Sequence, residues 1–338
     1  MKATDLDPLA HPDTPVWGIP PHERPDLIVD RTLLRLMLGS DDRDWGHDNL
    51  RLKELHAAGH RGAGVVVAVC DTGTDASHPD LKDQIIGKAD FTGSGPGDVQ
   101  GHATHCMGIA AAAENGGGIV GAAPDAKLLG AKVLSNSGSG LSTWIARGIR
   151  WAADNNADII SLSLGGPGPD GDTQAAVAYA VAKGCWVVAA AGNDGGPASS
   201  YPGNYPGVVC VAATDPQDRR ASFSTINPEN DVSAPGVNIF STLPGNRYGR
   251  MSGTSMATPY VSGSLACVRG ALKAAGKKVP PADELLLAIA ATAKDIPPAG
   301  RDSGTGWGLL DPVKLLAHLM GPVTPPPSPP PPPSPPVP

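Results

Sequence analysis

The chain has 338 residues and a formal net charge of −7, from 26 basic and 33 acidic side chains. This acidic balance argues against a broad basic surface that would bind nucleic acid. Hydrophobic residues make up 41% of the chain, which is typical of a globular protein. No apolar run approaches the roughly 18 residues of a membrane span, so we expect no membrane association.

The N-terminal residues contain early acids and no apolar core of a secretory signal, so we expect a cytoplasmic protein. None of the five cysteines forms a C-x-x-C pair, and several flank apolar runs. Free thiols favour a reducing compartment, which agrees with a cytoplasmic location. We interpret the cysteines as free core thiols and not as zinc ligands or disulfides. They are Cys70, Cys106, Cys185, Cys210 and Cys267.

The composition divides the chain into three parts. Residues 1–40 are polar and punctuated by proline, with one helical pattern at 30–40. Residues 41–318 form the expected folded domain. Residues 319–338 are dominated by proline, which predicts an extended tail outside the core.

Within the domain, apolar runs alternate with helical patterns. Continuous apolar strands that alternate with helices predict an α/β fold in three layers, in which helices cover both faces of a mostly parallel sheet. The expected strands are 64–71, 127–134, 157–165, 185–193 and 207–213, and the expected helices are 102–113, 142–156, 173–184 and 255–276.

Four polar residues stand where such strands end or helices begin. Asp71 and Asn193 directly follow strands, whereas His102 and Ser255 open helices. Each alone could be a helix cap, but together they supply an acid, an amide donor, a base and a nucleophile, the groups that acyl transfer requires. Pro259 is tolerable in the last helix because we expect it to fall in the first turn.

Three sequence blocks carry a family resemblance. They are D-T-G-T-D-A-S-H-P-D-L at 71–81, G-H-A-T-H-C-M-G-I at 101–109 and G-T-S-M-A-T-P at 253–259. In kind and order they resemble the signature blocks of the subtilisin-like serine proteases, and the pattern is most similar to the bacterial intracellular subtilisins. The resemblance implies the three-layer subtilisin-like fold and a serine endopeptidase.

The resemblance also implies a role for each of the four polar residues. Ser255 would be the nucleophile, His102 the base and Asp71 the group that orients the base, while Asn193 and the amide of Ser255 would form the oxyanion hole. His105, three residues after His102, would be structural. The second block reads H-A-T-H where the family usually has H-G-T-H, so Ala103 adds a methyl group near the site.

The resemblance further implies a groove that accepts an extended peptide as an added strand. A pocket for large apolar P1 side chains would lie at its centre, and Asp194 at its rim would either assist basic P1 residues or be a solvated loop acid. The expected groove and pocket residues are Gly138, Ser139, Gly140, Ser163, Leu164, Gly165, Ala190, Ala191, Gly192 and Ser200.

Structural calcium is the one cofactor that the resemblance implies, without an organic cofactor. Loop 113–119 is similar to the family's calcium loop, and its alternative interpretation is a plain glycine turn. The implied ligands are Asp80, Asn115 and the carbonyls of Ala113, Gly117 and Ile119, with Asp41 as a further candidate. A weaker second cation site is implied at the carbonyls of Gly203, Tyr205 and Val208.

Residues 1–40 are too few for an independently folded pro-domain. Relatives with short extensions use an Ile-Pro element to block the active site, and Ile19-Pro20, after Trp17 and Gly18, is the comparable element here. The other interpretation is a disordered polar leader.

Protein or peptide substrates are the expected partners, and the sequence does not define an oligomeric state. Two other functions also fit parts of the pattern, a transpeptidase or macrocyclase on the same fold and an inactive peptide-binding scaffold. The first would need a capping insertion, for which the 71–102 interval is short, and the second would not need all four polar groups.

Overall fold

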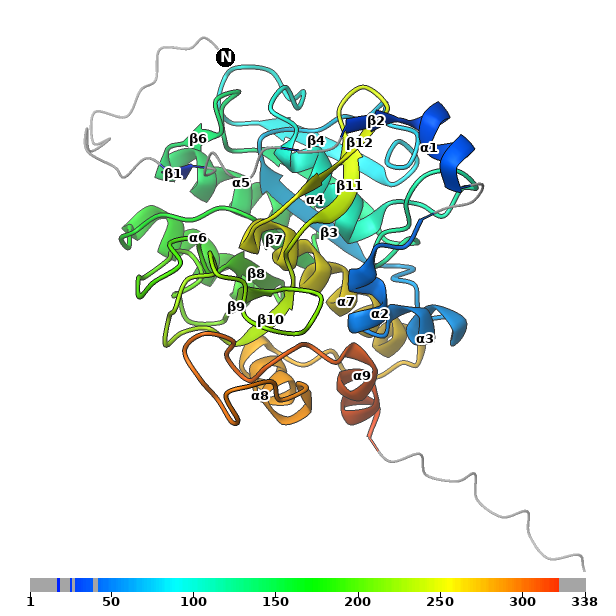
Figure 1. Cartoon of the computed structure of the whole chain (residues 1–338). Coiled ribbons are helices and arrows are strands. Elements are labelled where there is room, and N and C mark those ends of the chain that lie inside the picture. The colour runs from blue at the N-terminus through cyan, green and yellow to red at the C-terminus, as the bar shows by residue number, and fades with distance from the viewer. Residues whose placement is uncertain (1–16, 19–24, 26–27, 39–41, 322–338) are drawn as a thin grey trace, which may run out of the picture.

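The computed structural model describes residues 17–18, 25, 28–38 and 42–321 (Figure 1). At its centre is a seven-stranded sheet in the order β10-β9-β8-β7-β3-β5-β4, in which every pair of neighbours is parallel. The strands are β3 (Val66–Asp71), β4 (Ile85–Asp90), β5 (Lys127–Lys132), β7 (Ile159–Leu162), β8 (Trp186–Ala190), β9 (Val208–Thr214) and β10 (Val232–Pro235).

Helices cover both faces of this sheet, which confirms the three-layer prediction (Figure 1). One face carries α4 (His102–Ala111) and α7 (Thr254–Ala274), and the other carries α5 (Ser142–Asp154) and α6 (Gly171–Ala182). Strand β3 shows why the central strands are apolar throughout. Val67 and Val69 pack into the core on the α4–α7 side, while Ala68 and Cys70 pack into the core on the other side.

Close packing of α4 against α7 brings two candidate site residues together. Gly263 in α7 allows this approach, since a Cβ there would lie 2.6 Å from the carbonyl oxygen of Ala110 in α4. His102 is the first residue of α4 and Ser255 the second of α7. The two helices therefore present their N-terminal ends to the carboxyl edge of the sheet.

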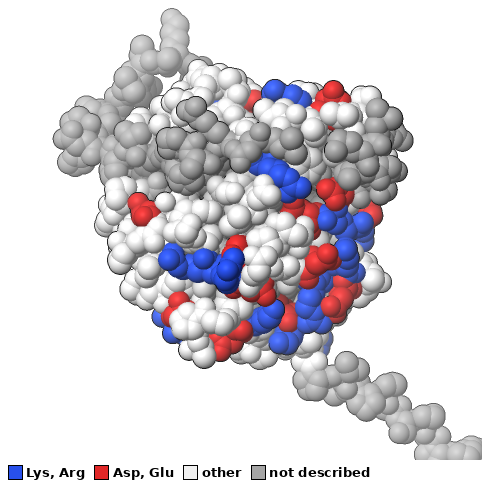
Figure 2. Space-filling model, in the orientation of Figure 1, with Lys and Arg blue, Asp and Glu red and all other residues white. Residues whose placement is uncertain are grey.

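Several elements were not predicted from the sequence. They include the helices α2 (Trp45–Asn49), α3 (Leu52–Ala57), α8 (Ala282–Thr292) and α9 (Pro312–Met320), strands β4 and β10, and the hairpin of β11 (Ile239–Leu243) and β12 (Arg247–Met251). Figure 2 shows acidic and basic side chains intermixed over the region of α2, α3 and α9. In this region Arg51 forms an ion pair with Asp311, the N-cap of α9, with 2.9 Å between Nη1 and Oδ2.

Two segments of the N-terminal extension pair with the domain. Strand β1 (Trp17–Gly18) is antiparallel to β6 (Ser139–Gly140), with Trp17 opposite Gly140. Strand β2 (Ile28–Asp30) is antiparallel to β12 and leads into α1 (Arg31–Leu38). The structure thus includes the helix expected at 30–40, whereas the proline-rich tail 322–338 lies outside the described residues. No helix among the described residues is long and apolar enough to span a membrane.

Candidate active site

A buried acid–base pair forms where β3 ends and α4 begins. Nδ1 of His102 lies 2.9 Å from both carboxylate oxygens of Asp71, and both side chains are fully buried. The amide of Thr72 donates to Asp71 Oδ1 at 2.6 Å, which fixes the carboxylate. Burial is the largest single influence and favours the neutral imidazole, but Asp71 together with Cys106 raises the pKa of His102 well above its usual value.

Asp98, which was not singled out from the sequence, holds this pair in place. Its carboxylate accepts from the amides of Gly101 and Thr104 and from the Thr104 hydroxyl, at 2.8, 2.8 and 2.5 Å. It also accepts from the Thr72 hydroxyl at 2.9 Å, beside Asp71. Asp98 therefore links the end of β3 to the first turn of α4, where His102 lies.

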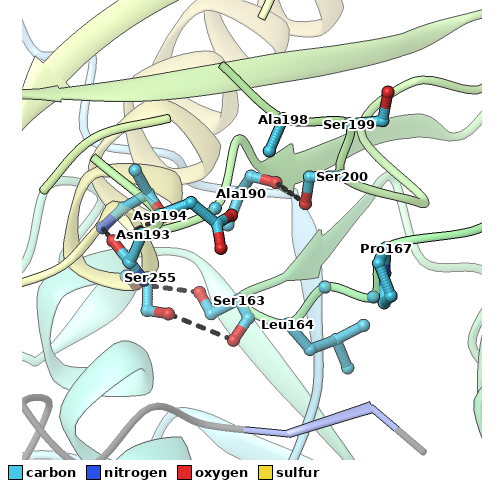
Figure 3. Close-up of a pocket in the computed structure, with 14 residues that line it drawn as sticks. Ser163, Leu164, Pro167, Ala190, Asn193, Asp194, Ala198, Ser199, Ser200 and Ser255 are labelled. Atoms are coloured by element: carbon cyan, nitrogen blue, oxygen red, sulfur yellow. Dashed lines mark hydrogen bonds between the residues drawn. The ribbon is translucent and has the colours of Figure 1, made fainter. Parts of the chain in front are cut away.

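Ser255 is held by an exchange of hydrogen bonds with Ser163 (Figure 3). Its Oγ donates to the Ser163 carbonyl at 3.3 Å, and the Ser163 hydroxyl donates to the Ser255 carbonyl at 2.8 Å. That carbonyl is available because Pro259, four residues on, has no N–H to donate. Pro259 is the sixth residue of α7, so the expectation that it falls in the first turn is wrong.

Cys106 joins the two halves of the site. Its Sγ donates to the Ser255 carbonyl at 3.4 Å and lies 3.9 Å from His102 Nδ1. Burial raises the pKa of the Cys106 thiol, which keeps it protonated. The sequence indicated only a core thiol, although the spacing of four residues from His102 already places both on one helix face.

Asn193 follows β8 and faces the first turn of α7. The amide and hydroxyl of Thr254 both donate to its Oδ1, at 2.9 and 3.1 Å. Because both Thr254 groups donate, the Asn193 atom that faces them must be the amide oxygen Oδ1. The amide nitrogen Nδ2 is therefore the end of the side chain that donates. The amide of Ser255 lies in the first helical turn, where N–H groups have no intrahelical acceptor.

A cavity of about 440 Å³ opens beside Ser255 (Figure 3). Its walls are the segment after β7 and the segment after β8, and the Ser200 hydroxyl donates to the Ala190 carbonyl at 3.4 Å. Asp194 also lines it and accepts from the Thr225 hydroxyl at 3.2 Å. The predicted residues along the cavity are Ser163, Leu164, Gly165, Ala190, Gly192 and Ser200, whereas Ala191 does not line it.

The other expected wall of the groove is β6. Gly138 precedes it with φ +82°, a conformation that favours glycine. A Cβ at Gly140 would lie 2.5 Å from the Val133 carbonyl oxygen, so this position has no room for a side chain. Ser139 and Gly140 are the residues that pair with β1 of the N-terminal extension.

The residues expected to bind calcium converge around Asp80, which is fully buried. Its carboxylate accepts from Asn115 Nδ2 and from the Ile119 amide, each at 3.1 Å. Loop 113–119, with Ala113 and Gly117, wraps it so closely that a Cβ at Gly118 would lie 2.0 Å from Oδ2.

A cation already contacts this group, because Arg31 Nη1 lies 2.9 Å from Asp80 Oδ1. Carboxylate and amide oxygens are the donors that calcium prefers, so the residues fit the metal. Asp41 lies outside the described residues. Its neighbour Asp42 donates its amide to the Gly118 carbonyl at 2.8 Å.

The residues of the expected second cation site are Gly203 and Tyr205 in the loop before β9 and Val208, the first residue of β9. The amide of Val208 donates to the Tyr205 carbonyl at 3.3 Å, so this proposed ligand atom already has a partner. Gly203 packs against Cys210, whose Sγ would be 2.9 Å from a Cβ at that glycine. The three residues therefore lie in the same short segment, 203–208, which includes the start of β9.

His105 occupies a different environment from His102. Its Nε2 lies 3.1 Å from the Gly249 carbonyl in β12, and burial lowers the pKa of the ring to about 3. A neutral, buried imidazole of this kind fits the structural role expected for it. Ala103 is fully buried in the same turn of α4.

The fold, the buried Asp–His pair and the serine at a helix N-terminus define a class of hydrolase, and comparison with known proteins identifies it. The model of the subtilase family (peptidase S8) matches residues 62–308, and the chain belongs to this family.

Among its relatives, thermitase from Thermoactinomyces vulgaris is 47% identical over 248 residues, which cover 72% of this chain and 84% of thermitase. The major intracellular serine protease of Bacillus subtilis (strain 168) is 46% identical over 232 residues, 65% of this chain and 73% of that protein. Subtilisin NAT from Bacillus subtilis subsp. natto is 45% identical over 231 residues. These residues cover 66% of this chain, and this chain spans only 60% of the length of subtilisin NAT.

Proposed function

We propose that this chain is a serine endopeptidase in which Asp71, His102 and Ser255 form the catalytic triad. The observation that carries the proposal is the buried Asp71–His102 pair, whose Nδ1 contact turns Nε2 outward as the base. Cys106 contacts both His102 and the Ser255 backbone, which supports a nucleophile beside this base. Relatives whose names denote serine proteases support the same activity.

Acylation then follows from the positions of these groups. The Ser255 hydroxyl turns from the Ser163 carbonyl to His102 Nε2, transfers its proton there and attacks the scissile carbonyl carbon. Asp71 stabilises the imidazolium that forms, and the same proton passes to the leaving amine. Water repeats the sequence on the acyl-enzyme, which regenerates Ser255.

The negative oxygen of each tetrahedral intermediate is stabilised by Asn193 Nδ2 and the amide of Ser255. Thr254 holds the Asn193 side chain with two hydrogen bonds, so the donor is oriented before the substrate binds. Donors that need no reorganisation stabilise the transition state more than the ground state.

An extended peptide is the proposed occupant of the groove. Backbone on both walls can pair with the substrate, as β6 already does with β1. The cavity beside Ser255 admits a large apolar P1 side chain. Asp194 extends this preference to basic side chains, because its carboxylate lines the same cavity.

Calcium is the cofactor that we propose for the loop around Asp80. Asp80, Asn115 and the carbonyls of Ala113, Gly117 and Ile119 would hold it, and the bound ion would tie loop 113–119 to the domain. The second site at residues 203–208 is proposed as a weaker one.

For the N-terminal extension we propose an inhibitory role, supported by the pairing of Trp17 and Gly18 with β6, a wall of the groove. Ile19 and Pro20 lie outside the described residues. Protein or peptide substrates are the proposed partners. A cytoplasmic location is proposed because all five cysteines are free and buried.

A fluorophosphonate probe tests the nucleophile directly. The probe should label Ser255 and block cleavage of a peptide with P1 Phe, and Ser255→Ala should abolish both the labelling and the cleavage while the fold remains intact. Undiminished cleavage by the purified Ser255→Ala protein would rule out the proposed triad. Labelling without hydrolysis of any peptide would favour the scaffold, and ligated products would favour the transpeptidase.

A further inference from the structure

The N-terminal extension places a side chain on the proposed calcium ligands. Arg31 Nη1 lies 2.9 Å from Asp80 Oδ1, and Nη2 donates to Asn115 Oδ1 at 2.6 Å. The Asp80 side chain is fully buried and that of Arg31 only 18% exposed. These two oxygens are the side-chain ligands proposed for calcium above, so the guanidinium contacts the same oxygens that the ion would need.

A buried carboxylate needs a positive partner, and this requirement explains the contact. The Tyr248 hydroxyl and the Ile119 amide donate to Asp80 Oδ2 at 2.8 and 3.1 Å, but both groups are neutral. Leaving a buried charge without a counter-charge is strongly destabilising. Arg31 supplies that counter-charge when no metal does.

The extension delivers Arg31 through regular structure. Strand β2 is antiparallel to β12, with Val29 opposite Tyr248, and the Arg31 amide donates to the Asn246 carbonyl at 3.2 Å (Figure 1). Leu34, one turn further along α1, is 4% exposed and packs into the main core. Pairing and packing on both sides of Arg31 therefore fix its guanidinium beside Asp80.

We propose that Arg31 and calcium are alternative occupants of the same site, so that calcium binding undocks segment 28–38 and the docked segment weakens calcium binding. This inference rests on the proposed calcium site. The guanidinium and the ion need the same two oxygens, and two cations within about 4 Å repel each other. Such coupling is reciprocal and typically amounts to 5–150-fold in affinity.

The test uses the full chain with Ser255→Ala, so that it cannot digest itself. Calorimetric titration with Ca²⁺ gives the Kd for this protein and for the same protein with Arg31→Ala or Thr32→Ala. Thr32 is an exposed neighbour in α1 and serves as the matched control. We expect Arg31→Ala to tighten calcium binding by about 5–150-fold and Thr32→Ala to leave it unchanged.

Hydrogen exchange supplies a second readout. Calcium should lower the protection of the β2 and β12 amides in the Ser255→Ala chain. If Arg31→Ala and the parent bind calcium equally, or if Thr32→Ala tightens binding as much, mutual exclusion is wrong although the calcium site stands. If none of the proteins binds calcium, or if Asp80→Asn and Asn115→Ala leave binding unchanged, the proposed calcium site itself is wrong.

Discussion

At the scale of single residues, Asp98 shows how a group outside the triad sets its geometry. The Gly101 amide donates to Oδ1 of Asp98 and the Thr104 amide to Oδ2. Replacing Asp98 with Asn removes the charge and puts an NH2 group, which cannot accept, opposite one of these two amides. The first turn of α4 should shift, and kcat/KM for a peptide substrate should fall by about 10–100-fold.

Asp90→Asn is the matched control for this prediction. Asp90 also accepts loop amides, those of Thr92 and Gly95, but it lies at the end of β4 on the outer edge of the sheet. We expect its kcat/KM to match that of the parent. Equal kcat/KM for Asp98→Asn and the parent would show that Asp98 does not position the triad.

A second prediction concerns the pH dependence of kcat/KM and follows from the raised pKa of His102. Only the neutral imidazole accepts the Ser255 proton, so kcat/KM falls as pH drops through this pKa, and the midpoint should lie above the usual value of 6.5. Asp71→Asn removes a group that raises the pKa, so the midpoint should move to lower pH while the plateau falls by about 10⁴-fold. The measurement is the pH profile of kcat/KM with an uncharged peptide, and an unmoved midpoint would contradict the assigned pair.

The sequence was informative about residues of this site to different degrees. Asp71, His102, Asn193 and Ser255 could be proposed because each adjoins a strand end or helix start within a family block. Asp98 could not, since its role depends on Thr72, which is 26 positions away and adjacent only in the fold. Arg31 is a similar case, because nothing near it in sequence indicates its contact with Asp80.

At the scale of elements, α4 carries both histidines, and they should fail in different ways. His105 joins α4 to β12 through the Gly249 carbonyl. His105→Ala leaves a cavity and removes the hydrogen bond to the Gly249 carbonyl, which should cost about 2–4 kcal/mol of unfolding free energy while most of the kcat/KM of the folded enzyme remains. His102→Ala should instead abolish turnover.

Urea unfolding and peptide cleavage separate these two effects. The variants should be compared in the Ser255→Ala background for unfolding and in the active background for cleavage. A stable, inactive His105→Ala together with an active His102→Ala would reverse the assignment of base and structural histidine.

Which elements could be predicted depended on how they are buried. The central strands are apolar throughout because they are covered on both faces, so β3, β5 and β9 were evident as apolar runs. Strand β12, R-Y-G-R-M, alternates charged and apolar residues around a glycine, and its pairing with β11 and β2 is what makes it a strand. The seven-strand order also follows from long-range pairing and not from local pattern.

At the scale of the whole molecule, the extension contacts the domain at two separate places. Strand β1 pairs with a wall of the groove, and β2 with α1 docks near Asp80. A tethered segment binds with an effective concentration in the millimolar range, so even a short pairing competes well with substrate. Inhibition by the extension should therefore be intramolecular, and the degree of inhibition should vary little with enzyme concentration.

Removing the extension tests this arrangement. A chain that begins at Ser40 should cleave peptides with a kcat/KM about tenfold or more above that of the full chain, because β6 is then open to the substrate strand. Deletion of residues 322–338 is the matched control and should leave kcat/KM unchanged. Mass spectrometry must show the extension intact during the assay of the full chain. With that established, equal kcat/KM values for the full and shortened chains would mean that the β1–β6 pairing does not obstruct the groove.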